Sequence, residues 1–203
     1  MRMKPSLNIG LDLDGVLYPI EYDFERMIQN EVDSNFTVND MTTWEFYKDF
    51  GLSTLEFNRM FAKYINNEEM FITQDPYPGV SEAIWKLHRM GHKLHIVTHR
   101  ETPSAETASM LLTHAWLAKQ KWPLKSVTIA EDKAIIQTDI FLDDAVHNLE
   151  RLNSVSIAMT GVSNAVCMNR LWNSDWKGLR INKFTTLVDL VSSLEEKVNE
   201  VRK

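Results

Sequence analysis

Acidic side chains follow apolar runs at two points that lie far apart in the chain. Asp12 and Asp14 lie at the end of a segment in which apolar residues alternate with other residues. Asp143 and Asp144 directly follow a second apolar segment. Carboxylates grouped in this way can hold a divalent cation, attack an electrophile and transfer a proton. These residue types are therefore typical of metal-assisted phosphoryl transfer, which needs each of those functions.

Phosphoryl transfer also needs groups that neutralise and orient the phosphoryl oxygens. Thr98 ends a third apolar run and offers its hydroxyl and the amides that follow it, and Lys133 lies ten residues before Asp143. His99 directly follows Thr98, so it is the histidine we expect to contact substrate. The predicted phosphate-binding set is Thr98, His99 and Lys133.

The spacing of the first two aspartates suggests different roles for them. Residues two apart on a strand point the same way, and the turn expected at Gly15 lets the second carboxylate swing toward a leaving group. We predict that Asp12 attacks phosphorus to form an aspartyl phosphate. Asp14 would protonate the departing alcohol and later deprotonate the hydrolytic water.

A carboxylate-rich site that keeps several waters suits Mg²⁺. We expect Asp12, the backbone carbonyl of Asp14, and Asp144 to supply the protein ligands. Asp143 would lie behind them and orient the site.

Strands alternate with helices along most of the chain, which predicts a doubly wound α/β fold with a mainly parallel sheet. Ligands bind beyond the carboxyl ends of the strands in such sheets, so Asp12, Thr98 and Asp143 should meet there. The periodicity predicts strands over residues 6–13, 94–98, 127–129, 140–142 and 155–159. It predicts helices over residues 80–90, 102–120, 145–152 and 187–198, with a short helix or turn at 135–136.

Residues 19–75 form a different unit, rich in aromatic residues and methionine at helical spacing. We predict a small helical cap there, with residues 1–18 and 76–203 forming the α/β core. Most of its aromatic side chains should form the interior of the cap, with one or two facing the cleft as a platform for a base. The aromatic residues concerned are Trp44, Phe46, Tyr47, Phe50, Phe57 and Phe61.

The composition limits the class of protein. The 203 residues are 44% hydrophobic and 25% charged, as in ordinary globular proteins, and the net charge of -6 argues against binding duplex nucleic acid. Asp12 and Asp14 come before any apolar run long enough for a signal peptide, and no later stretch could span a bilayer, so we expect a cytoplasmic protein without membrane contact. The lone Cys167 is interpreted as a small apolar side chain. Monomer and homodimer both remain open.

The motifs resemble the four signatures of the haloacid dehalogenase-like (HAD) hydrolase superfamily over residues 7–160. The first is similar to the segment from Asp12 to Leu17, and Thr98, Lys133 and the Asp143-Asp144 pair match the other three. The resemblance implies a Rossmann-like core with a cap inserted after the first strand. It also implies a phosphatase or phosphotransferase, because dehalogenase members lack the aspartate found here at Asp14.

Within that superfamily the chain resembles the 5′(3′)-deoxyribonucleotidases, through Pro76 to Ala83 and through Glu131-Asp132-Lys133. This implies dephosphorylation of a (deoxy)nucleoside monophosphate, with the cap over the base. Two departures stand out: His99-Arg100 replaces the usual Ser-Pro, and Ile20 stands near the position of a base-stacking aromatic. Ile20, Trp44 and Arg100 are the candidate substrate residues, although Arg100 could instead pair with Glu101.

Three alternatives remain open. Polynucleotide 3′-phosphatases have a second motif similar to the segment from Thr98 to Glu101, and other small-molecule HAD phosphatases share the same scaffold. A non-catalytic module that binds phosphate-bearing ligands is the third.

The stretch 169–180 lies either beside the active site or in ordinary surface packing. The histidines at positions 88, 92, 95 and 99 predict no metal site, because Gly91 interrupts their spacing.

Overall fold

A computed structural model describes the backbone of residues 6–201 and the side chains of residues 6–195. Six strands form one sheet in the order β3-β2-β1-β4-β5-β6, and every neighbouring pair is parallel. Strand order reverses between β1 and β4, as expected for a doubly wound sheet. The strands are β1 (Asn8–Leu11), β2 (Lys93–Thr98), β3 (Ser126–Ile129), β4 (Ile140–Asp143), β5 (Ala165–Met168) and β6 (Arg180–Ile181).

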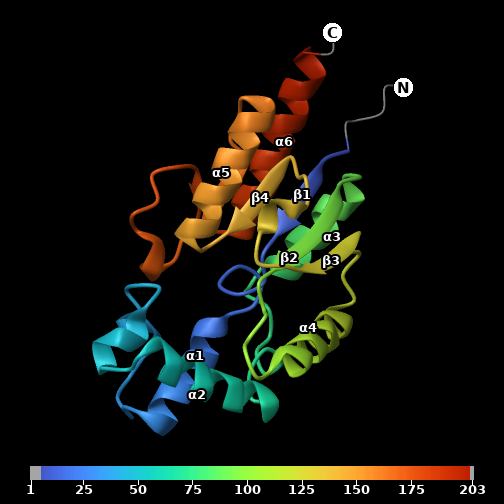
Figure 1. Cartoon of the computed structure of the whole chain (residues 1–203). Helices are drawn as coiled ribbons and strands as arrows, with labels where there is room; N and C mark the ends of the chain where they lie inside the picture. Colours follow the sequence, from blue (N-terminus) through green and yellow to red (C-terminus); the bar gives the residue numbers. More distant parts are fainter. Residues whose placement is uncertain (1–5, 202–203) are drawn as a thin grey trace.

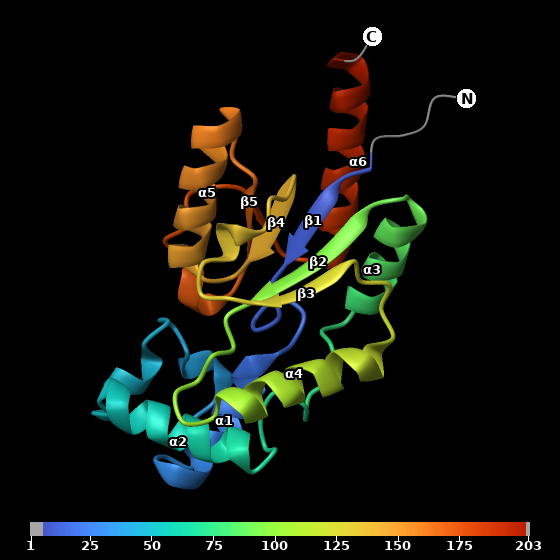
Figure 2. The same ribbon diagram turned by 45° about the vertical axis from the view of Figure 1, so that its right-hand side comes forward.

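Helices cover both faces of this sheet (Figures 1 and 2). Side chains alternate along the central strands, so that Ile140 and Leu142 join one apolar core and Phe141 the other. The first core also receives α3 (Val80–Arg89), α4 (Glu106–Gln120) and α6 (Phe184–Val201), and the second receives α5 (Val146–Thr160). No helix within the described part of the chain is long and apolar enough to cross a bilayer.

Two small residues let the second core close tightly. Gly10 on β1 faces the Phe141 ring, and a Cβ at this position would overlap that ring. Cys167 on β5 is fully buried in the same core, and burial raises the pKa of its thiol to about 11. The thiol therefore stays protonated at neutral pH, in agreement with its interpretation as an apolar side chain.

A helical unit lies beyond the carboxyl ends of the strands, at the opposite end of the molecule from the C-terminal end of α6 (Figures 1 and 2). It comprises α1 (Ile20–Glu31), α2 (Thr54–Asn66) and the 3-10 turns η1 (Val38–Asp40) and η2 (Phe46–Phe50). Ser53 and Glu56 form a capping box that starts α2. This unit is the expected helical cap after the first strand, and its division from the core at residues 18/19 and 75/76 remains a prediction.

The strand predicted over residues 155–159 is wrong. These residues continue α5, with Ile157 and Met159 about half exposed or more, at 48% and 63%. The alternation of apolar residues suggested a strand, but Gly161 ends the helix in a left-handed conformation at φ 76°. The next strand is β5, a short run buried on both sides that the sequence analysis missed, as it missed the two-residue β6.

Three other boundaries also differ. The first strand is β1, which is shorter than the predicted 6–13 because the chain turns after Leu11. The helix expected from residue 102 begins at Glu106, and Thr102 lies in the loop before it. The predicted helix 145–152 is the first part of α5. The remaining helices and strands lie where the periodicity placed them, within a few residues.

The contact between Gly10 and Phe141 gives a stability prediction. Gly10→Ala should lower the free energy of unfolding by about 1–3 kcal/mol, because the new methyl group overpacks the core. Denaturant unfolding measures this change. The same substitution in a Phe141→Leu background should cost less, since the smaller side chain leaves room for the methyl. An equal cost in both backgrounds would contradict this account of the contact.

Candidate active site

The ends of three adjacent strands bring together most of the predicted site residues. Asp12 follows β1, Thr98 ends β2 and Asp143 ends β4, and these strands are neighbours in the order β2-β1-β4. Lys133 reaches the same place from the 3-10 turn η3 (Lys133–Ile135), which precedes β4. Residues far apart in the chain therefore converge at the carboxyl edge of the sheet.

Lys133 is held between two carboxylates. Its Nζ lies 2.8 Å from Asp12 Oδ2 and 2.7 Å from Asp143 Oδ2, and the lysine is only 3% exposed. Burial by itself would lower the pKa of this ammonium, but the two carboxylates outweigh it and raise the pKa above its usual value. The two carboxylates therefore favour the charged ammonium form of Lys133, which contacts the candidate nucleophile.

Three buried carboxylates form a group that could hold a metal ion. One oxygen from each of Asp12, Asp143 and Asp144 lies within 4.8 Å of the others. Asp12 Oδ1 and Asp144 Oδ1 are buried and have no hydrogen-bond partner among the described residues. Burial raises the pKa of Asp144 well above its usual value, and the negative charges of Asp143 and Asp12 add to this effect. Oxygen ligands with uncompensated charge fit a hard divalent cation.

The segment after β5 supports these carboxylates. Trp172 Nε1 donates a 2.8 Å hydrogen bond to Asp144 Oδ2, and Asn173 Nδ2 donates to the Asp144 carbonyl at 2.8 Å. Arg170 Nε donates to the Gly15 carbonyl at 2.7 Å. Gly15 itself has φ 67°, and a Cβ there would overlap Asp144. The sequence left open whether residues 169–180 lie beside the active site or pack on the surface. The structure supports the position beside the site.

Thr98 and His99 both line a cavity whose wall also includes Asp12 and Lys133. Thr98 is 1% exposed, and its Oγ1 has no hydrogen-bond partner among the described residues. The hydroxyl is therefore available to a ligand at the point where the sequence predicted phosphate binding.

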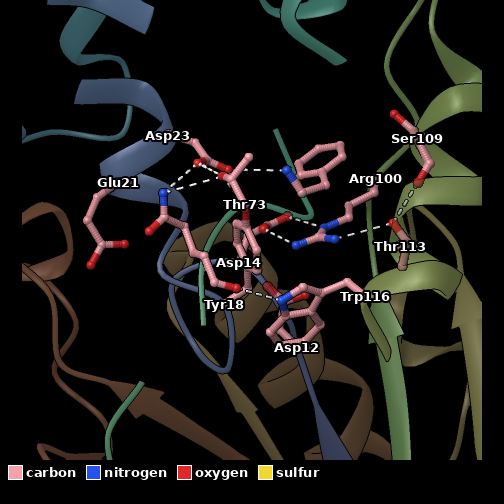
Figure 3. A network of polar contacts seen from close by, with 12 residues as sticks. Asp12, Asp14, Tyr18, Glu21, Asp23, Thr73, Arg100, Ser109, Thr113 and Trp116 are labelled. Carbon is pink, nitrogen blue, oxygen red and sulfur yellow. Dashed lines mark hydrogen bonds and ion pairs between the residues drawn. The ribbon is translucent and has the colours of Figure 1, made fainter. Parts of the chain in front are cut away.

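Asp14 takes a partner that the sequence analysis did not foresee. Arg100 Nε donates to Asp14 Oδ2 at 2.8 Å and Nη2 donates to Oδ1 at 2.6 Å (Figure 3). The Arg100 side chain is 0% exposed and does not line the cavity, whereas Asp14 does. Burial raises the pKa of Asp14 even though Arg100 acts in the opposite direction. Of the protein partners considered for Arg100, the structure shows Asp14 in place of the expected Glu101.

The cavity has a volume of about 330 Å³ and is bounded by the cap on the side away from the carboxylates. Two of the candidate substrate residues, Ile20 and Trp44, line it. Trp44 is half exposed and meets the ring of His147 edge to face, with centroids 5.8 Å apart. The aromatic side chains of residues 19–75 that line the cavity are Phe24, Trp44, Phe46, Tyr47, Phe57, Phe61 and Phe71.

Tyr47 and Phe57 stack with their ring centroids 4.3 Å apart and are mostly buried, so they form the interior of the cap as expected. Both also line the cavity, and more of the cap aromatics face it than the one or two that were expected. Phe50 does not line it.

Sequence reasoning missed several residues that line the cavity. His147 and Asn148 stand in the first turn of α5, directly after the Asp143-Asp144 pair, and Asn148 Nδ2 lies 3.4 Å from Asp143 Oδ1. Their closeness to that pair in the sequence was the available signal. No signal in the sequence pointed to Asn58 on α2, because only the fold of the cap turns it toward the cavity.

Solved structures share this fold over nearly the whole chain. A Lactobacillus delbrueckii subsp. bulgaricus protein named "putative phosphoglycolate phosphatase" matches with a TM-score of 0.62 and 11% identity, covering 94% of this chain and 99% of that one. A haloacid dehalogenase-like protein of Bacteroides fragilis matches with a TM-score of 0.58 and 12% identity, covering 90% and 100%. These likenesses show that the chain has the fold of the HAD-like hydrolases.

A comparison with family models assigns the chain to one particular family. The model of the family described as 5′ nucleotidase, deoxy (pyrimidine), cytosolic type C protein matches residues 6–183, and the chain belongs to this family. A protein of Oceanobacillus iheyensis named "putative nucleotidase" is 25% identical over 123 residues, which cover 58% of this chain. The match spans about 61% of that relative's length.

The uncompensated carboxylates predict that a divalent cation stabilises the fold. Saturating Mg²⁺ should raise Tm, since at 100 times the Kd binding adds about 2.7 kcal/mol of stability. For a chain of this size that is roughly 5–10 °C. A thermal scan with Mg²⁺, and again with a chelator, measures the shift.

Asp144→Asn should abolish most of this shift and raise Tm in the absence of metal, because it relieves the repulsion among buried carboxylates. Asp189→Asn, on the exposed surface of α6, makes the same chemical change away from the site and should keep the full shift. A Mg²⁺ shift of the same size in all three proteins would exclude these carboxylates as the metal site.

Proposed function

We propose that this protein is a Mg²⁺-dependent phosphomonoester hydrolase that acts on (deoxy)nucleoside monophosphates as a 5′(3′)-deoxyribonucleotidase. The observation that carries the proposal is that Asp12 and Lys133 line an aromatic cavity and lie against the buried Asp143-Asp144 pair. Membership of a family described as cytosolic nucleotidases supports both the substrate class and a cytoplasmic location.

Asp12 is the proposed nucleophile. It lies at the cavity wall, and its 2.8 Å contact with Lys133 fixes the orientation of the carboxylate. An oxygen of Asp12 attacks phosphorus, the bond from phosphorus to the sugar oxygen breaks, and an aspartyl phosphate forms. Thr98, His99 and Lys133 hold the phosphoryl oxygens in line during this step.

Asp14 is the proposed acid and base. It gives its proton to the departing sugar oxygen, and the raised pKa of the buried carboxyl favours the protonated form that this step requires. Asp14 then removes a proton from the water that attacks the aspartyl phosphate. Inorganic phosphate leaves and Asp12 returns to a free carboxylate.

The metal ligands are proposed to be Asp12, Asp144 and the backbone carbonyl of Asp14, with Asp143 orienting the site behind them. When bound there, Mg²⁺ would neutralise charge on the phosphoryl oxygens. Asp143 accepts hydrogen bonds from Lys133 and from the Ala145 amide, which fixes its carboxylate in this supporting position.

The cap side of the cavity suits a nucleoside. Its rings offer flat apolar surfaces for a base, and Asn58 and Asn148 are the amides that could bond to the base or the sugar. The volume of about 330 Å³ is appropriate for one small ligand. The net charge of -6 argues against a polynucleotide as the substrate.

Phosphate release from a panel of substrates tests the proposal. We expect turnover of deoxynucleoside 5′- or 3′-monophosphates with Mg²⁺ and none after chelation. A 3′-phosphorylated oligonucleotide in the same panel should react far more slowly. If the oligonucleotide is preferred, the protein is a polynucleotide phosphatase, and if nothing in the panel reacts, the protein is a binding module.

Asp12→Asn should lower kcat on the order of 10³-fold or more, because the covalent step loses its nucleophile. Circular dichroism should show an intact fold, and Asp189→Asn should keep the activity of the native sequence. Substantial activity in Asp12→Asn would exclude Asp12 as the nucleophile.

A further inference from the structure

Arg100 grips the Asp14 carboxylate by both oxygens. The two hydrogen bonds, of 2.8 Å and 2.6 Å, come from Nε and Nη2 of one guanidinium group. A paired contact of this kind fixes the plane of the carboxylate as well as its position, which a single donor could not do. The side-chain orientation of Asp14 is therefore set by Arg100.

Arg100 is itself held firmly. Its guanidinium carbon lies 4.1 Å from the centroid of the Phe71 ring and 4.8 Å from that of Tyr18. Its remaining nitrogen, Nη1, donates to Thr113 Oγ1 at 3.3 Å, and Thr113 donates in turn to the Ser109 carbonyl at 2.7 Å. Figure 3 shows this chain of contacts running from α4 through Arg100 to Asp14.

The two rings belong to the two chain segments that join the core to the cap. Tyr18 lies just before α1, and Phe71 lies on the return path after α2. Both segments bond to the buried Asp23 of α1, since the Tyr18 hydroxyl and the Phe71 amide donate to Asp23 Oδ2. Arg100 therefore connects Asp14 to the point where the cap is attached.

We propose that Arg100 is a positioning residue that holds Asp14 at the cavity wall in the orientation from which it reaches the leaving oxygen. Each of the three Arg100 nitrogens donates to a protein oxygen, and the side chain is 0% exposed, so it acts through Asp14 and not on the substrate. This inference rests on the proposed function, in which Asp14 is the acid.

Leaving-group dependence tests the proposal. A general acid matters most when the departing oxygen is strongly basic, as in a nucleotide, and little for an aryl phosphate such as p-nitrophenyl phosphate. Arg100→Met should lower kcat about 10- to 100-fold for a deoxynucleoside monophosphate but only a few-fold for the aryl phosphate, as misplaced acid catalysis requires. The ratio of the two kcat values does not depend on the fraction of protein that is folded.

A double-mutant cycle shows whether Arg100 acts through Asp14. Asp14→Asn should change the ratio at least as much as Arg100→Met, and adding Arg100→Met to Asp14→Asn should change it no further. Arg100→Lys keeps the charge but reaches only one oxygen, so it should give an intermediate ratio and serves if the methionine variant does not fold. Arg89→Met, on the exposed surface of α3, should leave the ratio unchanged.

The possible failures are distinguishable. If Asp14→Asn slows both substrates equally, the acid role in the proposed function is wrong, and the inference falls with it. If Asp14→Asn is selective but Arg100→Met slows both substrates equally, Arg100 only supports the fold. If the two substitutions add in the nucleotide reaction, Arg100 acts on the substrate independently of Asp14.

Discussion

The site depends on one buried ammonium placed among three buried carboxylates. Lys133 contacts Asp12 and Asp143, and such a pair is stable only while both partners remain, because an isolated buried charge is very costly. One positive charge cannot neutralise three negative ones. Asp144 is left with an indole hydrogen bond and a raised pKa, so this edge of the sheet is suited to a second positive charge of the kind that a divalent cation supplies.

The order of the parallel strands explains how these charged groups come together. β1 lies between β2 and β4, so one residue at the end of each strand meets the others without any long loop. Lys133 comes from η3, which packs against α5 on the second face, and so it approaches Asp12 from the side opposite the first core. The rigid sheet thus fixes the distances between charged groups, while the segments after β1 and β5 supply Gly15, Trp172 and Arg170 around them.

Much of this arrangement was predictable, because each motif residue follows an apolar run whose strand character is strong. Thr98 and Asp143 end β2 and β4 as predicted, and parallel strands must bring such ends to one edge. The error at residues 155–159 arose because alternation was taken as a sign of a half-buried strand. In the structure Ile157 and Met159 are simply exposed on a helix, and the true strand, β5, is buried on both sides and shows no alternation.

The contacts of Arg100 show why the remainder was not predictable. Arg100 and Asp14 are 86 residues apart, and nothing in either segment specifies the other. The guanidinium lies where it does because Tyr18 and Phe71 form its walls, and the segments that carry these rings both bond to Asp23 in the cap. A motif fixes the backbone position of a carboxylate at a strand end, but the partner of that carboxylate is decided by how the inserted helices pack. Arg100 therefore belongs to the attachment of the cap as much as to the surroundings of Asp14.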